Sequence, residues 1–446
     1  MKQNNFKSLG TLKNDFSTPE YKRSQRAYAA QCTFEYLVTL LVADAFLAKL
    51  LADIGMNPAF IGIVSSLISL AFLFQLFSVL VVQRITNTKV FCIIFHFASQ
   101  MVFMSLYFIP FLPISGGVKK ALAVGGILAA YFGNYFVTSV IYRWGNSYVS
   151  PSKRGSYSAG KEMISLLSGM AVTLIIGWTM DAFEAKGNLH GGFIFAAVGI
   201  FIFALCDLTC LLLIKNDIKP KIPKEEREKL SIKEVFSNTL GNRNYRNTII
   251  LYSIWEIAKY ATVGFLGAYK TGDLLMTMGI VQVVNIVSQG ARFAFSKPFG
   301  RYSDKHSYIK GIELALIVAA VAFAVNIFTT PSTWFLIIVY TVLYNVCQAG
   351  LTANFYNITY SYVNEKYFIQ ASAIKNSIGG LCGFTASLVS GALVGYIQLN
   401  DKTMAGEIFG LSVYAPQVLS VISLVLTVVC FLIAKLVIEK QKIMKQ

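Results

Sequence analysis

The sequence predicts an all-α integral membrane protein. Of its 446 residues, 55% are hydrophobic and only 14% are charged, and the mean hydropathy is +0.58, whereas a soluble domain usually devotes about 25% of its residues to charge. The 34 Phe and 23 Tyr residues exclude a disordered chain, and the 33 Gly residues follow no triplet period, which excludes collagen. The class that remains is a chain embedded in lipid.

Long stretches without Asp, Glu, Lys or Arg predict the membrane spans. Crossing about 30 Å of hydrocarbon takes ~20 apolar residues, and several charge-free runs are long enough. The run 314–364 is too long for one helix, so Pro331 and Ser332 near its middle predict a turn between two helices. We predict twelve helical spans, near residues 28–52, 58–82, 89–111, 118–141, 159–181, 192–214, 246–269, 274–296, 309–328, 332–356, 373–397 and 411–435.

The distribution of Lys and Arg predicts that both termini face the cytoplasm. Basic residues near span ends are retained on the cytoplasmic side of a membrane. With the amino terminus inside, most of the 39 Lys and Arg residues fall in cytoplasmic segments. The net charge of +17 then reflects loops beside an anionic leaflet of the cell membrane, inner or plasma, and no nucleic-acid partner is expected. The expected outward loops hold Lys119, Lys120, Lys186, Lys270 and Lys402.

No cofactor and no metal site are expected. All seven Cys residues fall inside predicted spans, and the three His residues, His96, His190 and His306, show none of the spacings typical of metal sites or hydrolases. We therefore expect a chain that is not an enzyme. A monomer in the lipid bilayer is the expected state.

A polar segment divides the chain into two halves of six spans each. We predict a cytoplasmic segment over 1–27, a first bundle over 28–214, a linker over 215–245, a second bundle over 246–437 and a tail over 438–446. The halves match at fixed offsets, which predicts two pseudo-symmetric six-helix bundles in parallel orientation. Gly62, Ile63 and Val64 match Gly279, Ile280 and Val281, and Lys161, Gly169 and Gly177 match Lys375, Gly383 and Gly391.

The segment after the eighth predicted span carries Gly300, Asp304, Lys305 and Lys310. With this motif, the duplicated halves and the twelve spans, the chain resembles the major facilitator superfamily of secondary transporters over nearly its whole length. The resemblance implies the fold of that family and a central cavity lined by spans 1, 4, 7 and 10. It also implies that the halves rock to open the cavity to one side at a time, with Gly300, Asp304 and Lys305 as gating residues.

Charged residues inside the predicted spans point to a central binding site. A charge at mid-bilayer costs roughly 2.5 to 3.5 kcal/mol on insertion scales and usually marks a pathway. Glu35, Asp44 and Lys49 lie in span 1, and Glu256 and Lys259 in the pseudo-equivalent span 7. The three acids are the proton-coupling candidates: helical spacing puts Glu35 and Lys49 on one face, favoured for the cavity, and Asp44 on the other. A local pair of Glu256 with Lys259 is as good an interpretation as a coupling role.

Polar and aromatic side chains recur at helical spacing in several spans. Such faces suit a sugar or another uncharged polar molecule, because rings stack on apolar faces and amides bond hydroxyls. Alternatively, they pack helices or bridge the two halves. The candidate cavity residues are Thr39, Lys49, Tyr131, Tyr135, Thr138, Tyr142, Trp255, Lys259, Gln282, Asn285, Gln289, Arg292, Asn345, Gln348 and Tyr356.

Paired cations begin spans 5 and 11. Lys161, followed by Glu162, and Lys375 are candidates for a cytoplasmic gate, and snorkelling of each lysine to the interface is the alternative. The resemblance places three other embedded residues on helices outside the cavity, so a structural role is expected for His96, Asp207 and Glu313.

The sequence therefore predicts a secondary active transporter that moves a small polar organic solute, sugar-like or glycoside-like, by proton symport. A buried carboxylate near a cation can bind a proton on one side of the membrane and release it on the other. The alternative is proton-driven efflux of drugs or metabolites. The antiporter signature of the family that the chain resembles, a G-P-x-x-G-G run, is absent from the fifth span, so efflux ranks second. The expected partners are the solute, a proton or another coupling cation, and the lipid bilayer.

Overall fold

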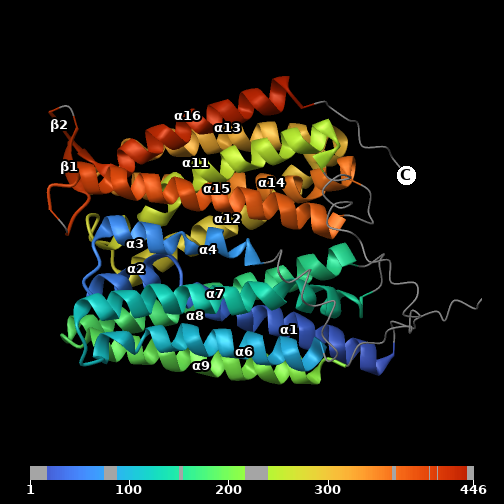
Figure 1. The fold of residues 1–446 in the computed structure, drawn as a ribbon, viewed down its shortest axis with the longest axis horizontal. Helices are drawn as coiled ribbons and strands as arrows, with labels where there is room; N and C mark the ends of the chain where they lie inside the picture. The colour runs from blue at the N-terminus through green and yellow to red at the C-terminus, as the bar shows by residue number, and fades with distance from the viewer. Residues whose placement is uncertain are drawn as a thin grey trace, which may run out of the picture.

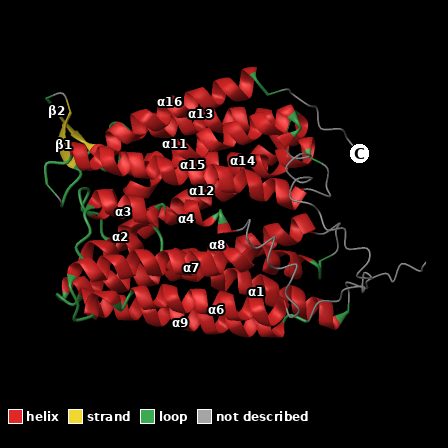
Figure 2. Cartoon of the chain, viewed as in Figure 1, coloured by secondary structure: helices red, strands yellow, loops and turns green. Residues whose placement is uncertain are grey.

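The computed structural model describes residues 18–74, 88–149, 154–215, 240–363, 368–400, 402–408 and 410–438. These residues are almost entirely helical (Figure 1, Figure 2). In chain order the helices are α1 (Pro19–Leu41), α2 (Asp44–Asp53), α3 (Pro58–Ser65), α4 (Leu67–Ala71), α6 (Thr88–Leu106), η2 (Ile109–Phe111), α7 (Gly116–Asn146), α8 (Arg154–Ala185), α9 (Leu189–Leu213), α11 (Arg243–Thr271), α12 (Met278–Lys305), α13 (Tyr308–Asn326), η5 (Pro331–Thr333), α14 (Leu336–Tyr362), α15 (Phe368–Ile397) and α16 (Ala415–Leu436).

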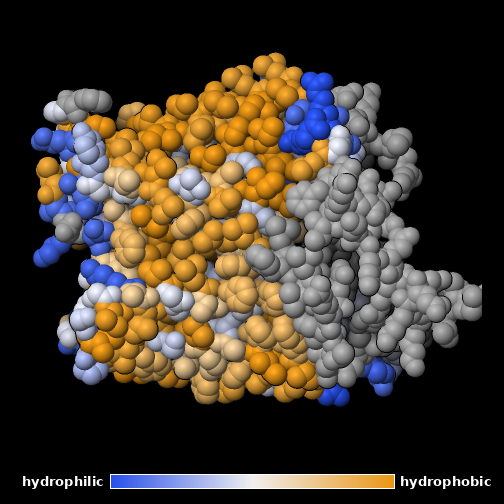
Figure 3. Space-filling view, viewed as in Figure 1, coloured by the Kyte–Doolittle hydropathy of each residue, from blue (hydrophilic) through white to orange (hydrophobic). Residues whose placement is uncertain are grey.

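The described helices confirm a helical, multi-pass membrane protein. Nine of them are long and apolar enough to cross a membrane, and the face drawn in Figure 3 is mostly hydrophobic between its two ends. Outside those nine, α1 and α12 are 23 and 28 residues long, but polar residues interrupt them. The α1 helix carries Glu35, and α12 carries Gln282, Asn285, Gln289 and Arg292, called the amide stripe below. The second predicted span begins as α3 and α4, and its residues 75–82 lie outside the described part. The number of twelve spans therefore stays a prediction.

Side-chain caps set the start of several helices. Asn57 accepts a hydrogen bond from the backbone N–H of Phe60 and precedes a proline at the first position of α3. Asn188, Asn242, Thr277 and Ser307 cap α9, α11, α12 and α13 in the same way. Each cap satisfies a backbone N–H that has no partner within its own helix. The polar residues between the apolar runs thus determine where each helix begins.

The helices form two groups that lie side by side (Figure 1). The first group contains α1 to α4 and α6 to α9, and the second contains α11 to α16; α2, α3 and α4 lie on the side of the first group that faces the second. The α2 and α3 helices pack on α11, α3 and α4 pack on α15, and α8 packs on α12. The start of α1 and the end of α16 lie at the same end of the molecule. The boundaries predicted for the two bundles and the cytoplasmic orientation of the termini remain predictions.

The first predicted span, 28–52, is not one continuous helix. The α1 helix ends at Leu41, and α2 begins at Asp44, whose backbone φ is +45°, in the left-handed region that non-glycine residues seldom occupy. The Tyr107 hydroxyl donates a hydrogen bond to the Leu41 carbonyl, whose partner in an unbroken helix would be a backbone N–H. Because the break directs α2 onto α11, the prediction that Glu35 and Lys49 share one helix face is wrong.

A short antiparallel hairpin precedes the last helix. Its strands are β1 (Ala405–Ile408) and β2 (Leu411–Tyr414), so the span predicted over 411–435 begins only with α16. Asp273, in the loop after α11, accepts the backbone N–H of Met404 with its two oxygens, at 3.0 and 3.1 Å. Burial raises the pKa of the Asp273 carboxyl to about 6, although the Met404 N–H opposes this rise by favouring the ionised form.

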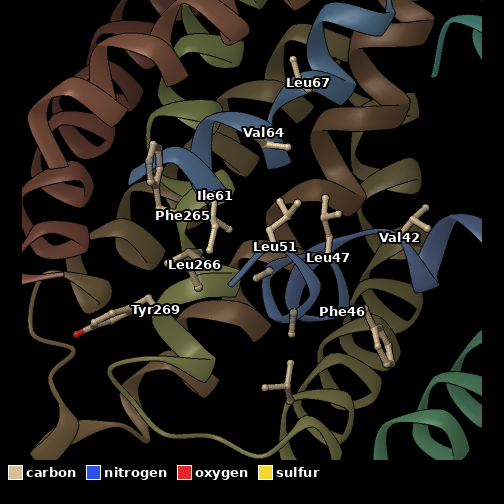
Figure 4. Close-up of a cluster of buried hydrophobic side chains, with 14 of the residues drawn as sticks. Val42, Phe46, Leu47, Leu51, Ile61, Val64, Leu67, Phe265, Leu266 and Tyr269 are labelled. Atoms are coloured by element: carbon tan, nitrogen blue, oxygen red, sulfur yellow. The ribbon is translucent and has the colours of Figure 1, made fainter. Parts of the chain in front are cut away.

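A hydrophobic cluster joins the two groups where α2 and α3 meet α11. The α3 and α11 helices approach closely at two glycines, because a Cβ atom on Gly264 would lie 2.7 Å from the carbonyl oxygen of Gly62. No side chain fits at that crossing. Figure 4 shows the cluster, which includes Phe46, Leu47 and Leu51 of α2, Ile61 and Val64 of α3, and Phe265 and Leu266 of α11, all of them buried.

Candidate functional site

A pocket in the first group of helices brings together four of the predicted site residues. Its volume is about 180 Å³. The lining offers one carboxylate, one ammonium, two phenol rings, one hydroxyl and one amide. It consists of Tyr28, Gln31, Cys32 and Glu35 of α1, Thr138, Ile141 and Tyr142 of α7, and Lys161 of α8.

Lys161 is held among aromatic rings in this pocket. Its ammonium nitrogen lies 4.6 Å from the ring centre of Tyr28 and 5.6 Å from that of Tyr142. The Cys32 sulfur lies 3.2 Å from the same nitrogen. A cation over an aromatic face gains about 0.5 to 2 kcal/mol. The two rings therefore position a positive charge in the same pocket as Glu35.

Glu35 differs from the other two candidate acids in its partners. It accepts a hydrogen bond of 3.1 Å from Nε2 of Gln31, one helical turn away, and within the described residues it has no ion-pair partner. Asp44 pairs with Lys270, and Glu256 pairs with Lys259. Among the three candidates, Glu35 is thus the acid that lines the pocket, and it does so without a direct ion pair among the described residues.

Tyrosine side chains from both groups of helices lie near one another. The rings of Tyr131 and Tyr135, both on α7, lie 6.2 Å apart. Both hydroxyls lie within electrostatic range of the Tyr260 hydroxyl on α11. Tyr344 on α14 lies within the same range of Tyr260 and of Glu256. These phenols bring polar and aromatic groups of the two halves together near Glu256.

Glu256 and Lys259 form a local ion pair, which is the alternative to a coupling role for Glu256 that the sequence left open. Nζ of Lys259 donates to both carboxylate oxygens of Glu256, at 2.9 and 2.7 Å, and the Glu256 side chain is only 3% exposed. Lys375 donates to the carbonyl of Phe355 and lies 5.0 Å from the ring centre of Tyr252. The pseudo-equivalent lysines Lys161 and Lys375 thus both lie over a tyrosine ring, although only Lys161 lines the pocket.

The amide stripe of α12 contacts the first group of helices. The Tyr36 hydroxyl donates to Oε1 of Gln289 at 3.1 Å, and Nδ2 of Asn285 lies 3.4 Å from Oδ2 of Asp44. The Arg292 guanidinium lies within electrostatic range of the Tyr36 hydroxyl. Asn285 and Gln289 therefore make the contacts expected of a bridge between the halves, which was one of the two interpretations of this stripe.

Asp44 and Lys270 form an ion pair between the two groups. Oδ2 of Asp44 lies 3.3 Å from Nζ of Lys270, whose side chain is 6% exposed. The prediction that Lys270 belongs to an outward loop is wrong, because α11 continues to Thr271. Lys49 pairs instead with Glu184 near the end of α8, within the first group, and it is not part of the pocket lining.

A second polar contact joins the groups at the same end. The carboxylate of Asp181 on α8 accepts the backbone N–H groups of Met278 and Gly279, the first two residues of α12. This end lies opposite the start of α1 and the end of α16. The two groups are therefore joined by charged side chains at one end of the bundle.

The remaining predicted cavity residues lie outside the pocket. Trp255 is 2% exposed and belongs to the hydrophobic core, and Gln282 is buried beside Gly177. Tyr356 is 44% exposed. Three others bond within their own helices: Thr39 to the Tyr36 carbonyl, Asn345 to the Thr341 carbonyl and Gln348 to the Thr352 hydroxyl.

The gating candidates occupy helix ends. Gly300, Asp304 and Lys305 form the last two turns of α12, which extends beyond the predicted end of the eighth span. Glu162 is exposed beside Lys161 on α8. Within the described residues, no group of three His, Cys, Asp or Glu side chains is arranged to hold a metal ion.

Sequence reasoning did not select Tyr28, Gln31, Cys32 and Ile141, which line the pocket. It also did not select Lys270 and Asp181, which join the two groups, or Tyr260 and Tyr344, which lie near the other tyrosines. Two of these had a usable signal. Tyr260 follows the embedded Lys259 directly, and Tyr344 lies one helical turn before Gln348. The contacts of Lys270 and Asp181 join residues 226 and 98 positions apart, and no local pattern reports such a distance.

No family model matches the chain, and no curated protein matches it. Solved structures of transporters do share its fold. The nucleoside transporter NupG is 13% identical, with 94% of this chain and 98% of that chain covered and a TM-score of 0.65. A bacterial homologue of the iron transporter ferroportin, solved in an inward-facing state, is 11% identical, with coverage of 93% and 98% and a TM-score of 0.65.

A bacterial homologue of the human lysosomal transporter Spinster, inward-facing and unoccupied, is 14% identical, with coverage of 94% and 98% and a TM-score of 0.63. These similarities extend over nearly the whole chain. The protein is a membrane protein with the fold of these transporters. The predicted likeness to the major facilitator superfamily is confirmed at the level of the fold.

Proposed function

We propose that the chain is a secondary transporter that moves a small polar organic solute by alternating access, with a proton as the coupling ion. The observation that carries the proposal is the position of Glu35. It lies without an ion-pair partner among the described residues, in a pocket that also holds Lys161 and two tyrosine rings. A fold shared with three kinds of transporter supports the same conclusion.

The lining of the pocket favours a sugar-like or glycoside-like solute. Tyr28 and Tyr142 offer ring faces, while Thr138, Gln31 and Lys161 offer hydrogen-bonding groups. Rings suit the apolar faces of a sugar, and hydroxyl, amide and ammonium groups suit its hydroxyls. A nucleoside is itself a glycoside, and the similar structure NupG is a nucleoside transporter. Nucleosides therefore belong among the first solutes to test.

Glu35 is the proposed proton carrier. Asp44 and Glu256 each have a lysine within hydrogen-bond distance, and a nearby cation keeps a carboxylate ionised. Glu35 shares its pocket with Lys161, but its close partner is the neutral amide of Gln31. A carboxylate in these surroundings can gain a proton while the pocket is open to one side and lose it after the pocket opens to the other.

The test has two stages. A thermal-shift screen of the purified protein against sugars, glycosides and nucleosides identifies a solute. Uptake of that solute, radiolabelled, into proteoliposomes is then followed under an imposed proton gradient. We expect Glu35→Gln to abolish gradient-driven accumulation and to retain part of the exchange of labelled for unlabelled solute, since exchange needs no net proton movement.

The matched control is Glu407→Gln, which removes an exposed carboxylate from the hairpin and should leave accumulation unchanged. Unchanged accumulation in Glu35→Gln would reject Glu35 as the proton carrier. Gradient-driven expulsion in place of uptake would favour the efflux alternative.

A further inference from the structure

A histidine and an aspartate lie against each other in the interior of the first group of helices. Nε2 of His96 on α6 is 2.7 Å from Oδ2 of Asp207 on α9, and both residues are 0% exposed. Gln100, one turn from His96, donates to the same Asp207 oxygen at 2.7 Å. The three side chains form a buried polar cluster that the transport mechanism proposed above does not use.

Burying this cluster at a helix interface has a free-energy cost. Within the described residues, Oδ1 of Asp207 and Oε1 of Gln100 have no hydrogen-bond partner although both atoms are buried, and such atoms carry a desolvation penalty. Packed apolar side chains of similar volume often stabilise a protein as well as a buried ion pair does. Packing alone therefore does not account for the pair, and ionisable residues inside a membrane usually have a function.

Gln31 connects the pair to the pocket. Its Nε2 atom lies 3.1 Å from Oε2 of Glu35 and 3.4 Å from Nε2 of His96. Gln31 is fully buried, whereas Glu35 lines the pocket beside it. A single amide group thus separates the proposed proton carrier from a second group that can hold a proton.

The charged groups that face His96 are few. Glu35 on α1 and Asp207 on α9 both lie within electrostatic range of the imidazole, and α7 presents the uncharged amide of Asn134. The thiol of Cys210, three residues after Asp207 on α9, lies within electrostatic range of that carboxylate. Two carboxylates therefore favour the imidazolium, and neutralisation of either one weakens that preference.

We propose that His96 and Asp207 form a second proton-binding site, coupled to Glu35 so that a proton on Glu35 and a proton on His96 disfavour each other. The proposal deepens the coupling role proposed for Glu35 and rests on it. A proton that reaches Glu35 from the pocket removes one of the two negative charges that favour a proton on His96. The imidazole then gives up its proton more readily, and it regains one when Glu35 is ionised again.

The test is a titration that needs neither a solute nor a gradient. The chain has three His residues, and His190 and His306 are exposed, so His190→Gln with His306→Gln leaves His96 as the sole imidazole. Nitrogen-15 NMR of this protein in lipid nanodiscs, labelled at histidine, reports the protonation of His96 from about pH 5 to about pH 10.

We expect His96 to titrate within that window. Glu35→Gln should move the midpoint to lower pH by roughly half a unit to one unit, because it removes one negative charge near the imidazole. Asp207→Asn should move it further, since that carboxylate is in direct contact. The matched control Glu184→Gln removes a carboxylate that pairs with Lys49, outside the cluster, and should leave the midpoint unchanged.

An imidazole that stays in one protonation state across the window, or a midpoint that Glu35→Gln does not move, would overturn the proposal. The Glu35→Gln measurement stands even if Asp207→Asn fails to fold. Because the titration requires no transport, its failure and a failure of the uptake assay are separate results.

Discussion

Oδ2 of Asp181 accepts a hydrogen bond of 2.7 Å from the backbone N–H of Gly279. This bond joins the end of α8 in the first group to the first turn of α12 in the second. The N–H groups of a helix's first turn have no partners within the helix, and the helix dipole favours an anion there. One carboxylate thus satisfies two N–H groups, of Met278 and Gly279, across the boundary between the groups.

We predict that Asp181→Ala weakens the contact between the end of α8 and the first turn of α12. A hydrogen bond to a charged group contributes about 1.5 to 3 kcal/mol, so the amides at the start of α12 should exchange with deuterium about tenfold faster or more. Hydrogen–deuterium exchange with mass spectrometry on peptides covering 274–284 measures this. Glu184→Gln, one turn further along α8, breaks a pair within the first group and should not change those peptides. Equal exchange in Asp181→Ala and the wild-type protein would contradict the prediction.

The pair of Asp44 and Lys270 should show energetic coupling. Asp44→Asn and Lys270→Gln are each expected to lower the apparent melting temperature, because each leaves one charge without its partner, and Lys270 is almost fully buried. Asparagine tolerates the left-handed backbone at position 44, so the first variant tests charge alone. The double variant should be less destabilised than the sum of the single variants, by about 0.5 to 3 kcal/mol. Strict additivity would show that the contact contributes nothing.

The glycine crossing between α3 and α11 should not accept a methyl group. In Gly264→Ala the new Cβ would lie 2.7 Å from the Gly62 carbonyl oxygen and 2.2 Å from Oγ of Ser66. We expect a loss of about 1 to 3 kcal/mol from overpacking, visible as a lower melting temperature. Gly290→Ala is the matched control, because a Cβ there meets nothing within 4 Å and alanine favours a helix. Similar behaviour of the two variants would argue against the close approach.

The raised pKa of Asp273, which bonds the segment before the hairpin, predicts that the stability of the folded chain depends on pH. Its pKa is raised from 3.8 to about 6, so the folded chain holds the proton at pH values where the unfolded chain has lost it. This contribution to stability is fully present below about pH 3.8 and is lost as the pH rises through about 6. Melting curves between about pH 4 and about pH 7 should show a component that disappears in Asp273→Asn. An identical pH profile in that variant would contradict the assignment.

Hydropathy located the helices because a membrane span must be long and apolar whatever its neighbours are. The runs that became α8, α9 and α16 needed no knowledge of tertiary contacts. Hydropathy could not locate the break before Asp44, because that interval is as apolar as the helices beside it. The break depends on Tyr107 and on α11, which are distant in sequence.

The candidate site was predictable to a similar degree. Glu35 is predictable as a charge embedded in a span, Tyr142 as part of a polar and aromatic helix face, and Lys161 as one of two cations at matching positions of the halves. The three meet in one pocket. Which acid would be paired could not be predicted, since Lys270 was assigned to a loop and its partner is Asp44. The pairing of His96 with Asp207 was equally hidden, because it joins α6 to α9.

The hydroxyl of Tyr107 supplies a hydrogen bond at the point where the first span is interrupted. It donates to the carbonyl of Leu41, so this oxygen keeps a hydrogen-bond partner although the helix ends there. The chain can therefore change direction at membrane depth and carry Asp44 across to the opposite half. Phenylalanine at position 107 would keep the ring but leave the carbonyl oxygen of Leu41 without a hydrogen bond. The break between α1 and α2 therefore depends on a single hydroxyl group.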